Sequence, residues 1–145
     1  GTGDFVNLFE PNATDLEENG YGKVVASVGE MSGEVPYTAF YARKSYINEN
    51  KDIIEAFTKA MAKGIKYTLE TEAKVVAQDI IDQFPDTDIQ ELALMIERYK
   101  EYDCWLTTPF VNEEIFTNLE DFLIDFESLD DYVPYESLVN NFYHE

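Results

Sequence analysis

Cysteine and histidine are nearly absent from this sequence, because each occurs only once. A single cysteine, Cys104, excludes an intramolecular disulfide but leaves the redox compartment open. As a nucleophile, Cys104 would need a histidine beside it, and His144 lies next to the C-terminus. We therefore interpret Cys104 as a small, inert thiol. Long apolar runs are absent as well, and a membrane span needs about 18 consecutive apolar residues, so none is predicted.

Positive charge is also scarce, since 10 Lys and Arg residues face 30 Asp and Glu residues and leave a net charge of −20. Phosphate contacts supply most of the affinity for nucleic acids, so this charge excludes a nucleic-acid partner. It disfavours anionic membrane surfaces for the same reason. We predict a solvated acidic surface, and the alternative is an acidic patch that docks on a basic partner.

Motifs for catalysis and for metal binding are missing too. The sequence contains no nucleophile elbow, HExxH motif, P-loop or paired Cys/His metal set. Adjacent acids such as Asp130-Asp131 and Glu113-Glu114 lack the alternating ligand spacing of an EF-hand loop, and we interpret them as solvated helix ends. The sequence thus predicts no enzyme, no cofactor and no metal site.

Apolar residues are plentiful: hydrophobic residues make up 45% of the 145 positions, which is enough for the core of one domain. Short stretches in the first third are dense in apolar and β-branched residues and adjoin turn residues, which predicts strands. These stretches are 4–11, 23–30 and 37–47. A short helix over 12–22 is predicted to end at Gly20 or Gly22. Three strands rarely form a satisfactory sheet alone, so the predicted fold class is α/β, with the strands belonging to a larger sheet.

Apolar residues at helical spacing predict that the remainder is mainly helical. The predicted helices cover 51–70, 72–84 and 87–103, with one more after Asn112 and a short one from Pro134. Asn50 and Asn112 are predicted N-caps, and Thr87 with Gln90 forms a predicted capping box. The side chains expected to face inward include Ile53, Phe57, Val75, Val76, Phe122, Leu123 and Phe126.

Several stretches occur in the order of a known family. They are GDFVNLFEP, VVASVGE and GEVPYTAFYARKSYINENKDIIEAFTKAMAKGIKY. This order resembles the second half of the substrate-binding proteins of ABC importers, in the branch for nitrate, aliphatic sulfonates and thiamine-pyrimidine precursors. The resemblance implies a partial type II periplasmic-binding-protein fold, in which two α/β lobes are joined by crossing strands and hold the ligand between them.

In that arrangement, residues 1–36 would form the last part of the second lobe. Residues 37–145 would form a crossing strand and the C-terminal helices of the first lobe. As a fragment, the two parts are expected to pack as one unit. The chain opens with GTGDF rather than Met, so we expect it to be part of a longer protein. The resemblance further implies an extracytoplasmic place, in the periplasm or as a cell-surface lipoprotein, and an ABC transporter permease as partner.

Three residues are candidates for binding the solute. Glu10 follows a predicted buried strand, where ligand crevices form in α/β sheets, and could accept hydrogen bonds from an amino or ring N–H group. Otherwise it is a solvated turn residue or a cap for the helix that follows. By the resemblance, Tyr37 and Thr38 would face the cleft, with Tyr37 stacking on a planar ligand; otherwise Tyr37 is a core aromatic.

The sign of the ligand's charge follows from the two arginines, Arg43 and Arg98, which the sequence places away from these candidates. An oxyanion calls for arginine or a helix N-terminus. An amino-heterocycle such as a thiamine pyrimidine precursor is therefore favoured over sulfonate or nitrate. The alternative function is an acidic protein-interaction module without a small ligand, which pairs through exposed strand edges. As a fragment, the chain could form a homodimer or swap strands.

Overall fold

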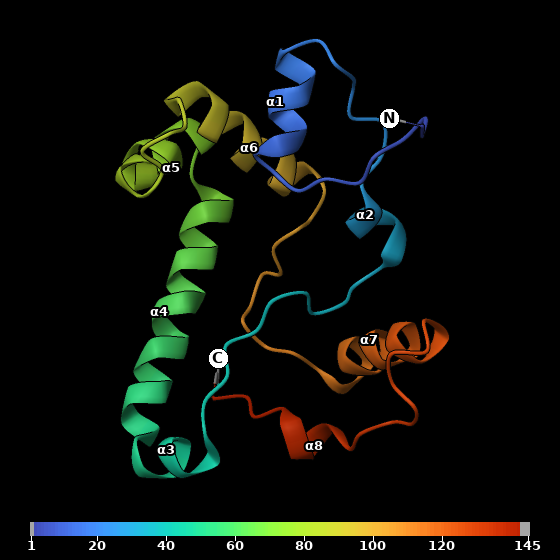
Figure 1. The fold of residues 1–145 in the computed structure, drawn as a ribbon. Coiled ribbons are helices and arrows are strands. Elements are labelled where there is room, and N and C mark those ends of the chain that lie inside the picture. The colour runs from blue at the N-terminus through green and yellow to red at the C-terminus, as the bar shows by residue number, and fades with distance from the viewer. Residues whose placement is uncertain (1, 143–145) are drawn as a thin grey trace. The chain divides into compact units, whose positions relative to one another are not determined.

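A computed structural model describes residues 2–142 of the chain, and His144 lies outside this range. The described residues form helices and connecting segments, with no β-strand among them (Figure 1). The elements are α1 (Asn12–Glu18), α2 (Val28–Ser32), α3 (Lys44–Glu49), α4 (Lys51–Glu70), α5 (Ala73–Ile80), the 3-10 helix η1 (Ile81–Gln83), α6 (Ile89–Glu101), α7 (Glu113–Asp125) and α8 (Tyr135–Leu138).

The predicted α/β fold class is wrong for the described part of the chain. Residues 4–9, 23–27 and 39–43 have no regular secondary structure, and the helices α2 and α3 begin inside two of the stretches that were predicted to be strands. A strand is stabilised by a partner strand and by a half-covered face, rather than by its own backbone preference. Neither is present here, since Phe5 is 84% exposed and Tyr41 is 98% exposed.

The helix predictions are confirmed for most of the chain, because helices are specified by local spacing and end signals. The helix α4 spans the predicted 51–70, and α5 with η1 covers most of 72–84. The end of α1 at Gly20 is also confirmed. Gly20 has φ +73°, its N–H donates to the Glu17 carbonyl, and the Tyr21 N–H donates to the Leu16 carbonyl. These two bonds form the Schellman motif that glycine favours.

The predicted helix caps are confirmed at one position and wrong at two. Asn112 Oδ1 accepts from the Ile115 N–H at 2.8 Å and caps α7 as predicted. The cap of α6 is Asp88, which accepts from the Gln90 N–H at 2.7 Å, rather than Thr87. A carboxylate there complements the positive end of the helix dipole. The side chain of Asn50 donates back to the Tyr46 carbonyl and so closes α3 instead of capping α4.

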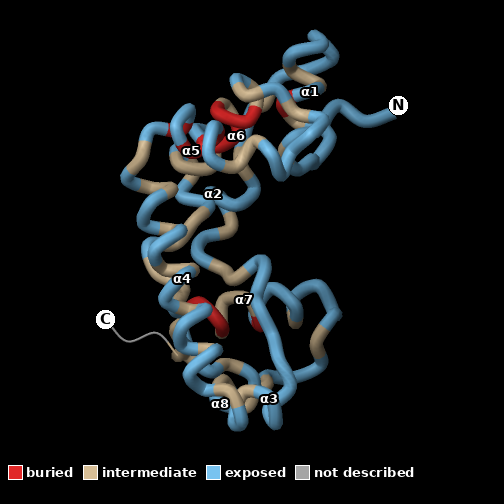
Figure 2. Tube along the Cα trace, turned by 90° about the vertical axis from the view of Figure 1, so that its left-hand side faces the viewer, coloured by how far each residue is buried: buried red, intermediate tan, exposed pale blue. Residues whose placement is uncertain are grey.

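Contacts group the chain into two units, and each is described by itself. The first unit consists of residues 1–31 and 70–105, and its core lies between α5 and α6 (Figure 2). The buried core residues are Ala73, Val76, Ala77, Leu92, Ala93, Met95 and Ile96. Val76 is 3% exposed but its neighbour Val75 is 39% exposed, so the prediction that both face inward is wrong for Val75. Adjacent helix positions point about 100° apart, and only one of the two can face α6.

The second unit consists of residues 32–69 and 106–145 and has a smaller buried core. In α7, Ile115 and Phe116 are buried, and Phe116 meets the ring of Tyr135 edge-on at 5.7 Å. The helix α4 has no buried residue. Several side chains that were predicted to face inward are exposed instead, namely Ile53, Phe57, Phe122, Leu123 and Phe126. An apolar row marks one helix face, but the row alone does not show that another element covers it.

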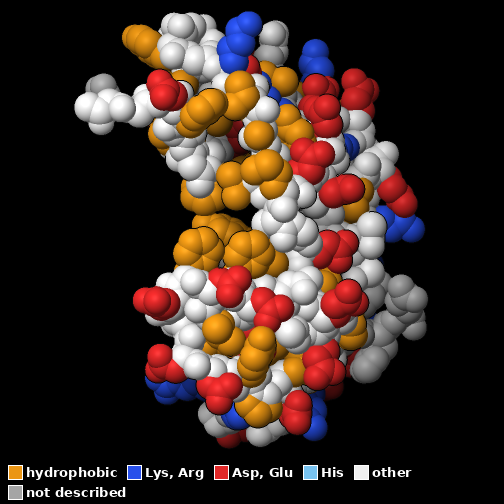
Figure 3. Space-filling view, turned by 90° about the vertical axis from the view of Figure 1, so that its right-hand side faces the viewer, with side chains coloured by type: hydrophobic (Ala, Val, Ile, Leu, Met, Phe, Trp, Pro, Cys, Tyr) orange, Lys and Arg blue, Asp and Glu red, His pale blue; other side chains and the backbone are white. Residues whose placement is uncertain are grey.

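Acidic side chains are spread over both units, and basic side chains are few on the face shown in Figure 3. None of the helices in the described range has the length and apolar character needed to span a bilayer. The boundary at residue 36, which was predicted for the lobes of a larger protein, stays a prediction.

Candidate functional site

The first unit contains a cluster of polar side chains around Arg98 of α6. Arg98 Nη1 donates to Glu10 Oε1 at 3.0 Å and to Thr14 Oγ1 at 2.8 Å, and Nη2 donates to Glu17 Oε2. The exposed fractions of the Arg98 and Glu10 side chains are 16% and 9%, and Thr14 is fully buried. We call these four residues the Arg98 cluster, which joins the start of α1 to α6.

Local sequence explains one side of the cluster. Positions 10, 14 and 17 are four and three residues apart, so they share one face of α1 and the turn before it. Glu10 Oε2 accepts from the Thr14 N–H at 3.0 Å, which satisfies a donor in the first turn of α1. This is the capping role that the sequence left open for Glu10. The expectation that Arg98 lies away from Glu10 is wrong, because a pairing across 88 positions leaves no trace in local spacing.

Electrostatics favour the charged forms of Glu17 and Arg98 in the cluster. The N–H of Val24 and the guanidinium of Arg98 lower the pKa of Glu17 below its ordinary value. Burial disfavours the charge on Arg98, but hydrogen bonds to Glu10 and Glu17 outweigh it and raise the pKa of Arg98. Since the pKa of Glu17 is lower in the folded chain, its stabilising contribution is present at neutral pH and is lost as the pH falls through that lowered value.

Glu91, in the first turn of α6, has the opposite shift and supports a prediction. Burial, then the carboxylates of Asp15 and Glu18, raise the pKa of Glu91 above the ordinary 4.5. These effects outweigh the backbone hydrogen bond from Asp88, which lowers the pKa of Glu91. A raised pKa means that ionisation of Glu91 costs the folded chain stability. This cost develops as the pH rises from the pKa of Glu91 in the unfolded chain to its higher pKa in the folded chain. We therefore expect Glu91→Gln to raise the urea midpoint at pH 7, and the gain to vanish below the ordinary glutamate pKa.

The measurement for Glu91 is urea unfolding at several pH values, followed by the fluorescence of Trp105. This is the only tryptophan, and it lies in the first unit beside Tyr99, with ring centroids 5.5 Å apart. Glu97→Gln is the control, because Glu97 is exposed on the same helix. An equal midpoint gain for Glu97→Gln, or a gain for Glu91→Gln that persists in acid, would contradict the assignment.

The other two candidate ligand residues lie in the second unit, in the segment between α2 and α3. Tyr37 is 77% exposed, so its alternative as a core aromatic is not what the structure shows. Thr38 is exposed as well. The structure brings Glu10 together with Arg98 in the first unit, whereas Tyr37 and Thr38 belong to the second. The role of all three in ligand binding stays a prediction.

Comparison with known proteins identifies a curated relative of this chain. Over 140 residues, the chain is 41% identical to "Putative binding protein YtlA" of Bacillus subtilis (strain 168). The aligned region covers 97% of this chain and 42% of that protein, so the chain spans less than half of the relative's length. No family model matches the sequence, and no solved structure matches it.

The chain is a homologue of a protein named as a binding protein. Identity of 41% across nearly the whole chain indicates common ancestry with that protein. That protein's name specifies neither a solute nor a transporter.

Cys104 follows the end of α6, where its N–H donates to the Tyr99 carbonyl at 2.9 Å. Burial and the adjacent Asp103 raise the pKa of the Cys104 thiol, so the thiol is protonated at neutral pH. This agrees with the interpretation of an inert thiol. Within residues 2–142, no group of three or more His, Cys, Asp or Glu residues is arranged to hold a metal ion.

Sequence reasoning missed three members of the Arg98 cluster, namely Thr14, Glu17 and Arg98. The spacing of Glu10, Thr14 and Glu17 was the available signal, because it marks a polar stripe on one face of α1. No local signal identifies Arg98 as the residue that meets this stripe.

Proposed function

We propose that this chain forms the C-terminal half of a solute-binding protein that delivers a small organic solute to an ABC importer. The observation that carries the proposal is the 41% identity, over 97% of the chain, to a longer protein named as a binding protein. The order of the stretches from GDFVNLFEP to the helix over 51–70 supports the same family. An extracytoplasmic location and a permease partner belong to the same proposal.

An amino-heterocycle, such as a pyrimidine precursor of thiamine, suits the described residues better than sulfonate or nitrate. An oxyanion is typically bound by an arginine or a helix N-terminus. Arg98 already binds the carboxylates of Glu10 and Glu17, and Arg43 is exposed at the start of α3. Glu10 can still accept a bond from an amino group, because each carboxylate oxygen has two lone pairs. The net charge of −20 also favours an amino-bearing ligand over an anion.

Calorimetric titration of the protein encoded by the complete reading frame tests this function. We expect binding of an aminopyrimidine precursor of thiamine, and no binding of ethanesulfonate or nitrate. Tyr37→Ala is expected to weaken binding by about tenfold, which corresponds to about 1.4 kcal/mol. This is the loss of one stacking contact. Tyr41→Ala is the matched control, because Tyr41 is a tyrosine of the same segment and is 98% exposed.

The two parts of the proposal fail separately. If the protein binds the solute and Tyr37→Ala matches Tyr41→Ala, the site assignment fails and the function stands. If no solute in a broad screen binds, the transport function fails. An acidic protein-interaction module would then be the better account, for which the net charge of −20 is the supporting observation.

A further inference from the structure

The helix α4 of the second unit has an apolar row that is exposed. The structure describes this helix in full, and none of its residues is buried, as the exposed and intermediate colours along α4 show in Figure 2. Ile53 is 56% exposed and Phe57 is 43% exposed. Ala60 and Gly64 are exposed as well. These four positions are four, three and four residues apart, so they form one row along the helix, which we call the α4 row.

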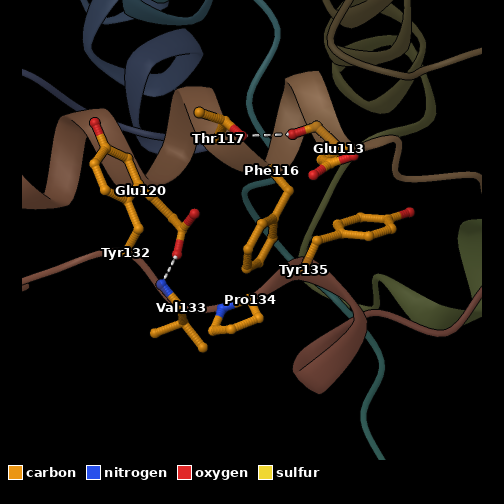
Figure 4. Close-up of a pocket in the computed structure, with 8 residues that line it drawn as sticks. All are labelled: Glu113, Phe116, Thr117, Glu120, Tyr132, Val133, Pro134 and Tyr135. Carbon is orange, nitrogen blue, oxygen red and sulfur yellow. Dashed lines mark hydrogen bonds between the residues drawn. The ribbon is translucent and has the colours of Figure 1, made fainter.

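The second unit forms its own core away from the α4 row. Phe116 of α7 meets the ring of Tyr135 edge-on, and Glu120 of α7 accepts from the Val133 N–H at 2.7 Å. Figure 4 shows these residues around a hollow of about 270 Å³, and no residue of α4 lines this hollow. The core of this unit therefore leaves the α4 row available to another partner.

Phe40, in the segment before α3, extends the α4 row. Its ring meets that of Phe57 edge-on, with centroids 4.8 Å apart, but Phe40 is itself 74% exposed. The two rings and Ile53 thus form a surface of large apolar side chains in contact with water. Contiguous apolar surfaces of this kind mark sites of interaction with another polypeptide.

Gly64 gives independent support, because nothing in the described part of the chain requires a glycine there. Gly64 lies inside α4, and a Cβ atom at this position would meet no atom within 4 Å. Glycine is disfavoured inside a helix, since it loses more conformational freedom than any other residue. It is favoured where another backbone approaches closely. The α4 row is therefore shaped for a neighbour that packs close to the helix at Gly64.

The homologous protein indicates which polypeptide this neighbour is. The alignment covers 97% of this chain but only 42% of the relative, so more than half of the relative's length lies outside it. A second copy of this chain is a less suitable occupant, because two chains with a net charge of −20 each repel one another. The part of the relative outside the alignment is thus the better candidate.

We infer that the α4 row is the docking surface for the polypeptide region that corresponds to the unaligned part of the Bacillus subtilis relative. Ile53 and Phe57 supply the apolar contact, and Gly64 permits the close approach. The inference rests on the same homology as the proposed function, but it requires neither a solute nor a transporter.

The test compares Gly64→Leu in two proteins, with thermal unfolding followed by circular dichroism and no solute present. The first is the 145-residue chain alone. The second is a chimera, in which this chain replaces the aligned region of the full-length relative. In the chain alone, we expect Gly64→Leu to raise the thermal midpoint by about 2–4 °C, because leucine favours the helix and its side chain enters open space. In the chimera, the same substitution should lower the midpoint by about 2–6 °C, because leucine collides with the docked region.

Two further variants keep the test specific. Lys63→Leu introduces the same side chain at the neighbouring exposed position, about 100° around the helix, and should not lower the midpoint of the chimera. Ile53→Ser should lower the midpoint more in the chimera than in the chain alone, because only docking buries Ile53.

A change of the same sign in both proteins for Gly64→Leu, or a chimera without cooperative unfolding, would overturn the inference. So would sedimentation of the chain alone as a dimer that Gly64→Leu dissociates, because a second copy would then occupy the row. Titration of the unsubstituted chimera with solutes tests the proposed function separately, so the two can fail independently.

Discussion

Replacing Arg98 by alanine is expected to lower the free energy of unfolding of the first unit by about 2–3 kcal/mol. Arg98 donates to Glu10, Thr14 and Glu17, and it joins α1 to α6. The substitution leaves the Glu10 carboxylate, which is 9% exposed, without its cationic partner. Removing one member of a largely buried pair costs more than the pair itself contributes, because the remaining charge stays desolvated. The partial exposure of Arg98, at 16%, keeps the estimate below the range for a sealed pair.

Urea unfolding followed by the fluorescence of Trp105 measures this loss in the first unit. The matched control is Arg43→Ala. Arg43 is exposed in the second unit, and no ion pair of its side chain is observed among residues 2–142. An exposed substitution of this kind changes stability by about 0.5 kcal/mol or less. If Arg98→Ala were as mild as Arg43→Ala, the Arg98 cluster would not hold α1 to α6.

Two neighbouring valines in α5 provide the second prediction, since the sequence places both inward and the structure buries only one. Val76 is 3% exposed in the core against α6, and Val75 is 39% exposed. We expect Val76→Ala to cost about 2 kcal/mol, from the buried methyl groups that are lost and the cavity that remains. Val75→Ala should be close to neutral. The gain of about 0.5 kcal/mol in helix propensity applies at both positions and cancels in the comparison.

The same Trp105 fluorescence measures both valine variants, because α5 lies in the first unit. The decisive quantity is the difference between the two free energies of unfolding, which should be about 2 kcal/mol. Equal losses at the two positions would mean that α5 is rotated relative to the described arrangement. A larger loss at Val75 would reverse the assignment of the buried face.

The Arg98 cluster shows how much of a polar site local sequence can predict. Glu10, Thr14 and Glu17 follow helical spacing, and the bond from the Thr14 N–H to Glu10 agrees with a capping role visible in the sequence. Their partner lies on α6, more than 80 positions away. Many carboxylates in this acidic chain could accept from Arg98, and only the packing of α1 on α6 selects these two.

By itself, the sequence determined α1 and the helices from α4 onward, the cap of α7, the end of α1 at Gly20 and the acidic character of the chain. Helical hydrogen bonds and caps join residues within about four positions, so their signals lie in neighbouring letters. Only the tertiary structure decided that the apolar stretches before α2 and α3 form no strands, that Val76 rather than Val75 is buried, and that Arg98 meets Glu10. Strand pairing, burial and ion pairs depend on which distant segment lies opposite, and local spacing carries no record of that choice.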